Sequence, residues 1–155
     1  MKLVFFDLGD TLESGDVLLP GALETLQGIA DLRSSGGEPA VLGLISDFDM
    51  PSPEYYAILD LLGIRSFFEP VATRVTLSNE VGVFKPDPRI FREAIDRIDP
   101  GLEFGDALFI TERRSHVVAA RQLGMQAVHF QGPGQQTGDV ERLPDLIPLV
   151  RQSLG

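Results

Sequence analysis

The chain has 155 residues, no cysteine and a formal net charge of −10. This length fits a single domain, residues 1–155, and a hydrophobic content of 43% argues against disorder. The acidic balance disfavours nucleic acid and anionic membranes as partners. The lack of cysteine excludes thiolate catalysis and suits a reducing compartment. No apolar run reaches membrane-spanning length, and we expect a cytoplasmic protein.

Apolar runs alternate with helical patterns along the chain, which is typical of parallel β–α–β units. The helices are recognised by apolar residues at helical spacing, with proline near a start or glycine near an end. In chain order, the pattern predicts a strand at 2–7, a helix at 21–34, a strand at 40–46, a helix at 52–63, a strand at 70–73, a helix at 87–98, a strand at 106–111, a helix at 114–124, a strand at 126–130 and a helix at about 139–153.

These elements predict an α/β fold, an open and mostly parallel five-stranded sheet with helices on both faces. In such a sheet, ligands bind at the carboxyl ends of the strands. Asp7 follows the first strand, Ser46 and Asp47 come at the end of the second, and Glu112 follows the fourth, while Lys85 precedes a helix. An acid, a hydroxyl, a lysine and a second acid suit a phosphoryl group with a divalent metal, because hydroxyl and ammonium groups bind its oxygens.

Four segments, taken in order, resemble the motifs of the haloacid dehalogenase-like (HAD) superfamily, most of whose members are phosphatases. They are "FFDLGDTL", "LGLIS", "VGVFKPDPRIFREAI" and "ALFITERRSHVVAARQLGM", and together they span nearly the whole chain. The third segment is the most specific of them. The resemblance implies a Rossmann-like three-layer sandwich with strand order 3-2-1-4-5.

The resemblance also implies roles for individual residues. Asp7 would be the nucleophile that attacks phosphorus, Ser46 would hydrogen-bond the phosphoryl group, and Lys85 would neutralise charge in the transition state. Asp47 is expected to line the substrate site beside Ser46 and Lys85. A Mg²⁺ ion would be held by Asp7, Glu112 and the backbone carbonyl of Gly9.

The first and fourth motifs depart from the phosphatase pattern, and the fourth reads Thr111-Glu112 where the phosphatases carry Gly-Asp or Asp-Asp. Gly9 stands where the phosphatases carry an aspartate that protonates the leaving group and later activates water, and losing such a group costs roughly 10²–10⁴-fold in rate. His116 stands where the fourth motif carries a further Asp or Asn, and imidazole is a poor ligand for magnesium. Asp10 lies one place after Gly9, and two alternatives stay open for it: a shifted acid that compensates, or a surface acid. Two alternatives also stay open for His116: a role that compensates for the missing acids, or a packing role in the helix.

About thirty residues separate the first motif from the second strand, and a helix takes up most of them, so we expect a member without a cap domain. An uncapped site would suit a large substrate such as a phosphoprotein, or a second subunit that acts as a lid, whereas a small phosphate would gain little burial there. The expected partner is a phosphorylated small molecule or a phosphoprotein. The leading hypothesis is a HAD-like hydrolase, a Mg²⁺-dependent phosphatase or phosphotransferase that acts slowly through an aspartyl-phosphate on Asp7. The alternative is a catalytically decayed relative that binds a phospho-ligand or a protein. The sequence does not predict the oligomeric state.

Overall fold

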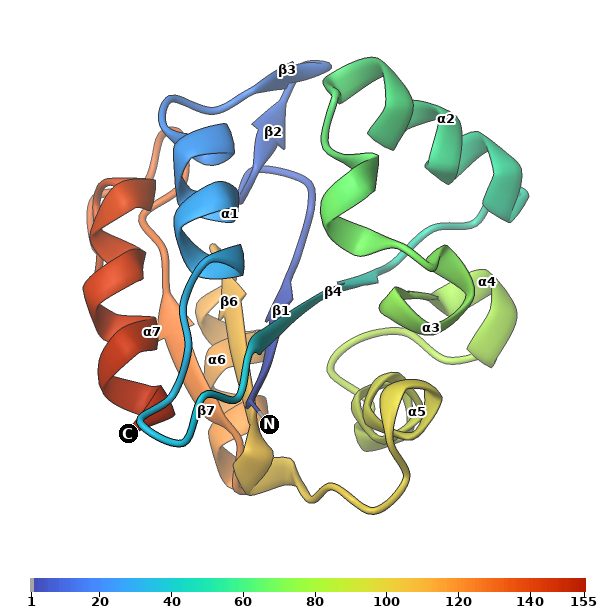
Figure 1. Ribbon diagram of the computed structural model, residues 1–155. Coiled ribbons are helices and arrows are strands. Elements are labelled where there is room, and N and C mark those ends of the chain that lie inside the picture. Colours follow the sequence, from blue (N-terminus) through green and yellow to red (C-terminus); the bar gives the residue numbers. More distant parts are fainter. Residues whose placement is uncertain (1) are drawn as a thin grey trace.

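The computed structural model describes residues 2–155, and its centre is a five-stranded parallel sheet (Figure 1). The strands are β1 (Lys2–Phe6), β4 (Ala40–Ser46), β5 (Val75–Leu77), β6 (Ala107–Thr111) and β7 (Gln126–His129). Their order across the sheet is β5-β4-β1-β6-β7. This confirms the predicted fold class and the predicted strand order, with β1 at the centre of the sheet.

Helices cover both faces of the sheet and give it three layers. One face packs against α1 (Ala22–Ala30), α2 (Ser52–Leu62) and α7 (Leu146–Leu154), and the other against α5 (Pro88–Ile98) and α6 (Arg114–Gln122). The strands β1 and β4 are buried along their whole length, as expected for a sheet covered on both sides. In α5, the Asp87 side chain accepts a hydrogen bond from the Arg89 amide, and Pro88 opens the first turn.

Three elements differ from their predicted ranges by more than two residues. Residues Val71–Arg74 form one helical turn, α3, and the third strand begins only at Val75, because the Pro70 carbonyl accepts the amides of Thr73 and Arg74. The last helix begins at Leu146 and not near 139, since Val140 pairs with Phe130 and a 3₁₀ turn, η3, precedes the helix. Helix α1 ends at Ala30, four residues before the predicted end.

Several short elements complete the chain. A two-stranded hairpin, β2 (Glu13–Ser14) and β3 (Val17–Leu18), follows β1 and was not predicted. It stands beyond the carboxyl end of β1 and near α2 in Figure 1. The other short elements are η1 (Arg65–Phe68), α4 (Ser78–Val81), η2 (Phe104–Asp106) and η3 (Leu143–Asp145). Within residues 2–155 no insertion is large enough to form a cap. In the same part of the chain, no helix combines the length and the apolar character that a membrane span requires.

Candidate phosphoryl site at the carboxyl end of the sheet

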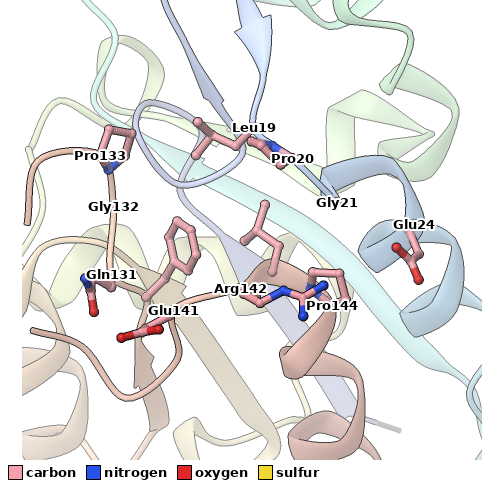
Figure 2. Close-up of a pocket in the computed structure, with 12 residues that line it drawn as sticks. Leu19, Pro20, Gly21, Glu24, Gln131, Gly132, Pro133, Glu141, Arg142 and Pro144 are labelled. Atoms are coloured by element: carbon pink, nitrogen blue, oxygen red, sulfur yellow. The ribbon is translucent and has the colours of Figure 1, made fainter.

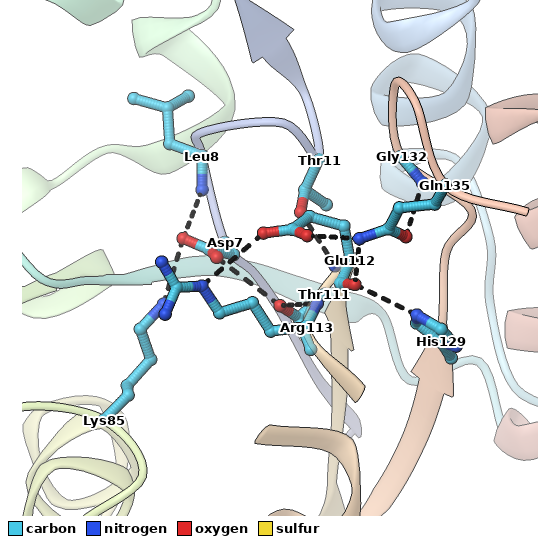
Figure 3. A network of polar contacts seen from close by, with 10 residues as sticks. All are labelled: Asp7, Leu8, Thr11, Lys85, Thr111, Glu112, Arg113, His129, Gly132 and Gln135. Carbon is cyan, nitrogen blue, oxygen red and sulfur yellow. Dashed lines mark hydrogen bonds and ion pairs between the residues drawn. The ribbon is translucent and has the colours of Figure 1, made fainter. Parts of the chain in front are cut away.

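Asp7 and Lys85 form an ion pair at the carboxyl end of β1. The Lys85 Nζ lies 2.9 Å from the Asp7 Oδ1, and the two side chains are 2% and 13% exposed. The same Oδ1 accepts the amide of Leu8 at 2.9 Å, while the Thr111 hydroxyl approaches Oδ2 at 3.4 Å (Figure 3). The carboxylate is thus fixed from one side by a charged donor and a backbone donor, and Oδ2 has only a long contact.

Lys85 reaches Asp7 from a segment far away in the sequence. Its backbone amide donates to the Asp47 Oδ1 at 2.8 Å, so the aspartate after β4 fixes the loop that carries the lysine. Its ammonium also lies 5.6 Å from the centre of the Phe109 ring. The structure therefore brings Asp7, Asp47 and Lys85 together, and it shows Asp47 bound to the lysine backbone.

Ser46 ends β4 and is bound to a partner that the sequence did not indicate. Its hydroxyl lies 2.6 Å from the hydroxyl of Tyr55, on α2, and both side chains are buried. Burial raises the pKa of Tyr55, so its hydroxyl stays protonated and is able to donate. When Tyr55 donates to Ser46, the proton of Ser46 is free to point toward a ligand oxygen.

Glu112 lies beside Asp7 and is held by a loop that follows β7 (Figure 3). Gln135 donates to both the carbonyl and the Oε2 of Glu112, at 2.8 and 2.6 Å, and the Thr11 hydroxyl accepts the Glu112 amide at 3.1 Å. Burial raises the pKa of Glu112, and the negative charge of Asp7 raises it further. The two carboxylates are therefore close enough to repel each other.

This donor set is compatible with a magnesium ion. Two partly buried carboxylates that repel each other are stabilised by a cation between them, and Asp7, Glu112 and the Gly9 carbonyl offer only hard oxygen atoms. Within residues 2–155, no three Asp, Glu or His side chains gather in a metal-binding arrangement. Water would have to complete the coordination, which Mg²⁺ commonly allows.

Gly9 has room for a side chain, whereas Asp10 adopts a backbone conformation that favours glycine. A Cβ placed on Gly9 would meet only the Glu13 Oε1, at 3.8 Å, and Gly9 is not in the left-handed region, so this position has room for a side chain. Asp10, in contrast, has a φ of 56°, a conformation that favours glycine. Its side chain is exposed.

A pocket of about 200 Å³ opens beside Asp7. Its lining is made of Asp7, Leu8, Gly9, Glu13, Asp16, Ser46, Asp47, Phe48, Tyr55 and Ile58. Glu13, Asp16 and Tyr55 line this pocket, and Gln135 binds Glu112. The sequence reasoning missed these four residues because none of them directly follows a strand of the five-stranded sheet.

A larger pocket of about 340 Å³ lies between the segment before α1 and the chain that follows β7 (Figure 2). It is lined by the segment before α1, by residues after β7 and by the η3 region, with Leu19, Pro144 and Arg142 among them. None of Asp7, Ser46, Asp47 or Lys85 lines it. A side chain at Gly132 would collide with the Asp10 carbonyl, at 2.8 Å, so the glycine permits the loop beside this pocket to pack on the site. The candidate phosphoryl site is therefore the smaller pocket, which Asp7, Ser46 and Asp47 line.

His116 is buried on α6, and its Nδ1 has no hydrogen-bond partner. Burial lowers its pKa from 6.5, and the positive charges of Lys85 and Arg113 lower it further, against the opposing effect of Asp7 and Asp47. In the unfolded chain this histidine takes up a proton as the pH falls through its ordinary pKa, whereas the folded protein binds that proton only at lower pH.

Stability is therefore expected to fall as the pH drops from about 7.5 to about 5.5, because the unfolded state then binds more protons. His116→Gln removes this contribution, so the Tm of wild type should fall more than that of the variant over this interval. Thermal unfolding of both proteins at the two pH values measures the difference. Equal slopes would show that His116 titrates in the folded protein as it does in the unfolded chain.

The fold and this set of strand-end groups define an α/β protein with a candidate site at the carboxyl end of its sheet. No protein-family model matches the chain. The chain is 32% identical over 123 residues to haloacid dehalogenase-like hydrolase domain-containing protein 3 of Bos taurus, over 76% of this chain and 44% of that protein. It is 29% identical over 148 residues to a glyceraldehyde 3-phosphate phosphatase of Pyrococcus abyssi, over 88% and 56% of the two chains. It is 30% identical over 117 residues to acyl-CoA dehydrogenase family member 10 of Mus musculus, over 76% and 10%.

Solved structures show the same fold. A haloacid dehalogenase-like hydrolase of Streptococcus pneumoniae superposes with a TM-score of 0.68 at 12% identity, over 96% of this chain and 98% of that chain. A predicted phosphoglycolate phosphatase of Haemophilus somnus superposes with a TM-score of 0.63 at 20% identity, over 85% and 56%. The chain spans about half or less of the length of the curated relatives named above. It belongs to the haloacid dehalogenase-like superfamily.

Proposed function

We propose that the chain is a Mg²⁺-dependent HAD-like hydrolase that acts on phosphate monoesters through an aspartyl-phosphate on Asp7. The ion pair between Asp7 and the buried Lys85 is the observation that carries this proposal. It holds a carboxylate at the end of the central strand, next to a fixed positive charge and the Ser46 hydroxyl that lines the same pocket. Phosphorylated small molecules or phosphoproteins are the proposed substrates.

In the first step a carboxylate oxygen of Asp7 forms a bond to phosphorus, and the bond from phosphorus to the ester oxygen breaks. Lys85 and the Ser46 hydroxyl stabilise the negative charge on the phosphoryl oxygens. Asp7, Glu112 and the Gly9 carbonyl would hold a magnesium ion, which supplies further charge neutralisation when bound. The leaving oxygen takes its proton from water, because Gly9 has no side chain to donate one.

In the second step a water molecule attacks the aspartyl-phosphate and releases inorganic phosphate and the free carboxylate. An aryl ester such as 4-nitrophenyl phosphate needs little protonation of its leaving group, so the first step should suffer little from the missing acid. The second step lacks a base at Gly9 and should be slow. We therefore expect the aspartyl-phosphate to accumulate during turnover.

Rapid mixing with 4-nitrophenyl phosphate and Mg²⁺ tests this proposal. The expected result is a burst of nitrophenolate of about one equivalent per enzyme, followed by slow turnover. Removal of Mg²⁺ with a chelator and the variant Asp7→Asn should each abolish the burst. Product formation that persists in Asp7→Asn would contradict the aspartyl-phosphate route.

The absence of an acid at Gly9 also favours a second candidate, a binding protein on the same scaffold. It would hold a phospho-ligand or a protein through Asp7, Ser46 and Lys85 without turnover. The rapid-mixing experiment, together with thermal unfolding, distinguishes the two candidates. A protein that shows no burst and no turnover, but whose Tm rises with Mg²⁺ and beryllofluoride, would support the binding function. A Tm that ignores both would contradict both candidates.

A further inference from the structure

The pocket beside Asp7 has two unlike walls, one apolar and one acidic. The apolar wall consists of Leu8, Phe48, Tyr55 and Ile58. The acidic wall is formed by Glu13 and Asp16 of the hairpin region, with Asp47 at its edge. Lys and Arg are absent from the residues that line this pocket, so apart from the ammonium that pairs with Asp7 the space offers no cation to a ligand.

The apolar wall is held in place by contacts between its own residues and with Ser78. The rings of Phe48 and Tyr55 meet edge to face, with centroids 5.1 Å apart and planes at 76°. The Ser78 hydroxyl accepts the Phe48 amide at 2.8 Å and lies 3.1 Å from the Phe48 carbonyl, to which it donates. A fixed aromatic edge of this kind is a suitable surface for an aromatic or apolar group of a ligand.

The acidic wall stands on the side where Gly9 leaves space. The Glu13 Oε1 is the nearest atom to a Cβ built on Gly9, at 3.8 Å, and the Glu13 Oε2 accepts the Asp16 amide at 3.1 Å. The hairpin pairing of Glu13 with Leu18 fixes the backbone that carries this carboxylate. Burial raises the pKa of Glu13, the hydrogen bond from the Asp16 amide lowers it, and the negative charges of Asp16 and Asp10 raise it.

We propose that this pocket receives the leaving group of the phosphate ester and selects groups that are aromatic or apolar and carry no further negative charge. The inference rests on the proposed function, because it places the phosphoryl group at Asp7. A second anionic group on the substrate would face Glu13 and Asp16 with no cation to neutralise it. Substrates with a carboxylate close to the phosphate are therefore expected to be poor ones.

The experiment compares two matched esters, 4-carbamoylphenyl phosphate and 4-carboxyphenyl phosphate, which differ by one negative charge at nearly constant shape. At pH 8 and low ionic strength, kcat/KM should favour the neutral ester by about tenfold, the size expected for partly screened charges at a surface. The preference should shrink as salt is added. The double variant Glu13→Gln/Asp16→Asn should bring the ratio close to one, and asparagine is tolerated at the φ of 66° of residue 16.

The control variant is Glu24→Gln, which removes one negative charge from an exposed position on α1 outside this pocket. It should leave the ratio between the two esters at the wild-type value. A ratio near one in wild type, or a ratio that does not change in the double variant, would overturn the inference while leaving the proposed function intact.

If the proposed function is wrong, neither ester should be hydrolysed, which is a different result from an altered ratio between the two esters. Binding then decides the inference, measured by calorimetry with the same two esters on Asp7→Asn. The neutral ester should bind about tenfold more tightly, and the Glu13→Gln/Asp16→Asn changes should remove the difference. Equal binding of both esters, or binding of neither, would overturn it.

Discussion

Lys85→Met is expected to destabilise the fold by about 3 kcal/mol and to slow the chemical step by roughly 10²–10³-fold. The Lys85 ammonium lies 2.9 Å from the Asp7 carboxylate, and its side chain is 2% exposed. Methionine keeps most of the aliphatic volume but leaves the carboxylate with only the Leu8 amide and the distant Thr111 hydroxyl as partners. Breaking a buried pair from one side costs more than removing the whole pair.

Urea unfolding measures the loss of stability, and the amplitude and rate of the burst measure the slowing of the chemical step. The double variant Asp7→Asn/Lys85→Met is the control, because it removes both charges. It should be inactive but regain much of the lost stability, which would show that the single variant suffers from an uncompensated charge. If Lys85→Met unfolds at the same urea concentration as wild type, the ion pair between Lys85 and Asp7 contributes nothing to the stability of the fold.

The sequence placed Asp7 at the site because the end of an apolar run marks the end of a buried strand. An apolar run that stops at Asp7 and another that stops at Ser46 define parallel strands, and parallel strands place their carboxyl ends at one edge. Lys85 lies outside any strand and was a candidate because it precedes a helix, and the family resemblance supplied its role. The strand order followed from the same resemblance and agrees with the structure.

The missed residues have a physical reason in common. Tyr55 comes from the buried side of α2, where a tyrosine looks like any other core residue, and only packing against β4 brings its hydroxyl to Ser46. The strands β2 and β3 contain two residues each, too few for any alternation to be visible. A strand was expected at 70–73, where Val71 and Thr73 are β-branched, whereas Pro70 precedes a helical turn over Val71–Arg74.

Gly9→Asp is expected to raise steady-state turnover by about 100-fold, within the range that a positioned general acid–base group contributes. The backbone at Gly9 permits the change, because the added Cβ meets only the Glu13 carboxylate at 3.8 Å and φ lies outside the left-handed region. The gain should come from faster hydrolysis of the aspartyl-phosphate. The burst should therefore become smaller relative to steady-state turnover, because the second step no longer limits the reaction.

Gly9→Asn is the matched control, since it has nearly the same size and no acid. It should leave turnover at the wild-type level, so a gain in Gly9→Asp alone would identify the carboxylate as the missing group. The new aspartate would lie close to Glu13, and the like charges oppose each other, so Gly9→Asp/Glu13→Gln should gain at least as much. If none of these variants exceeds wild type, the limit lies at the other departure, where Glu112 and His116 replace the acids of the fourth motif.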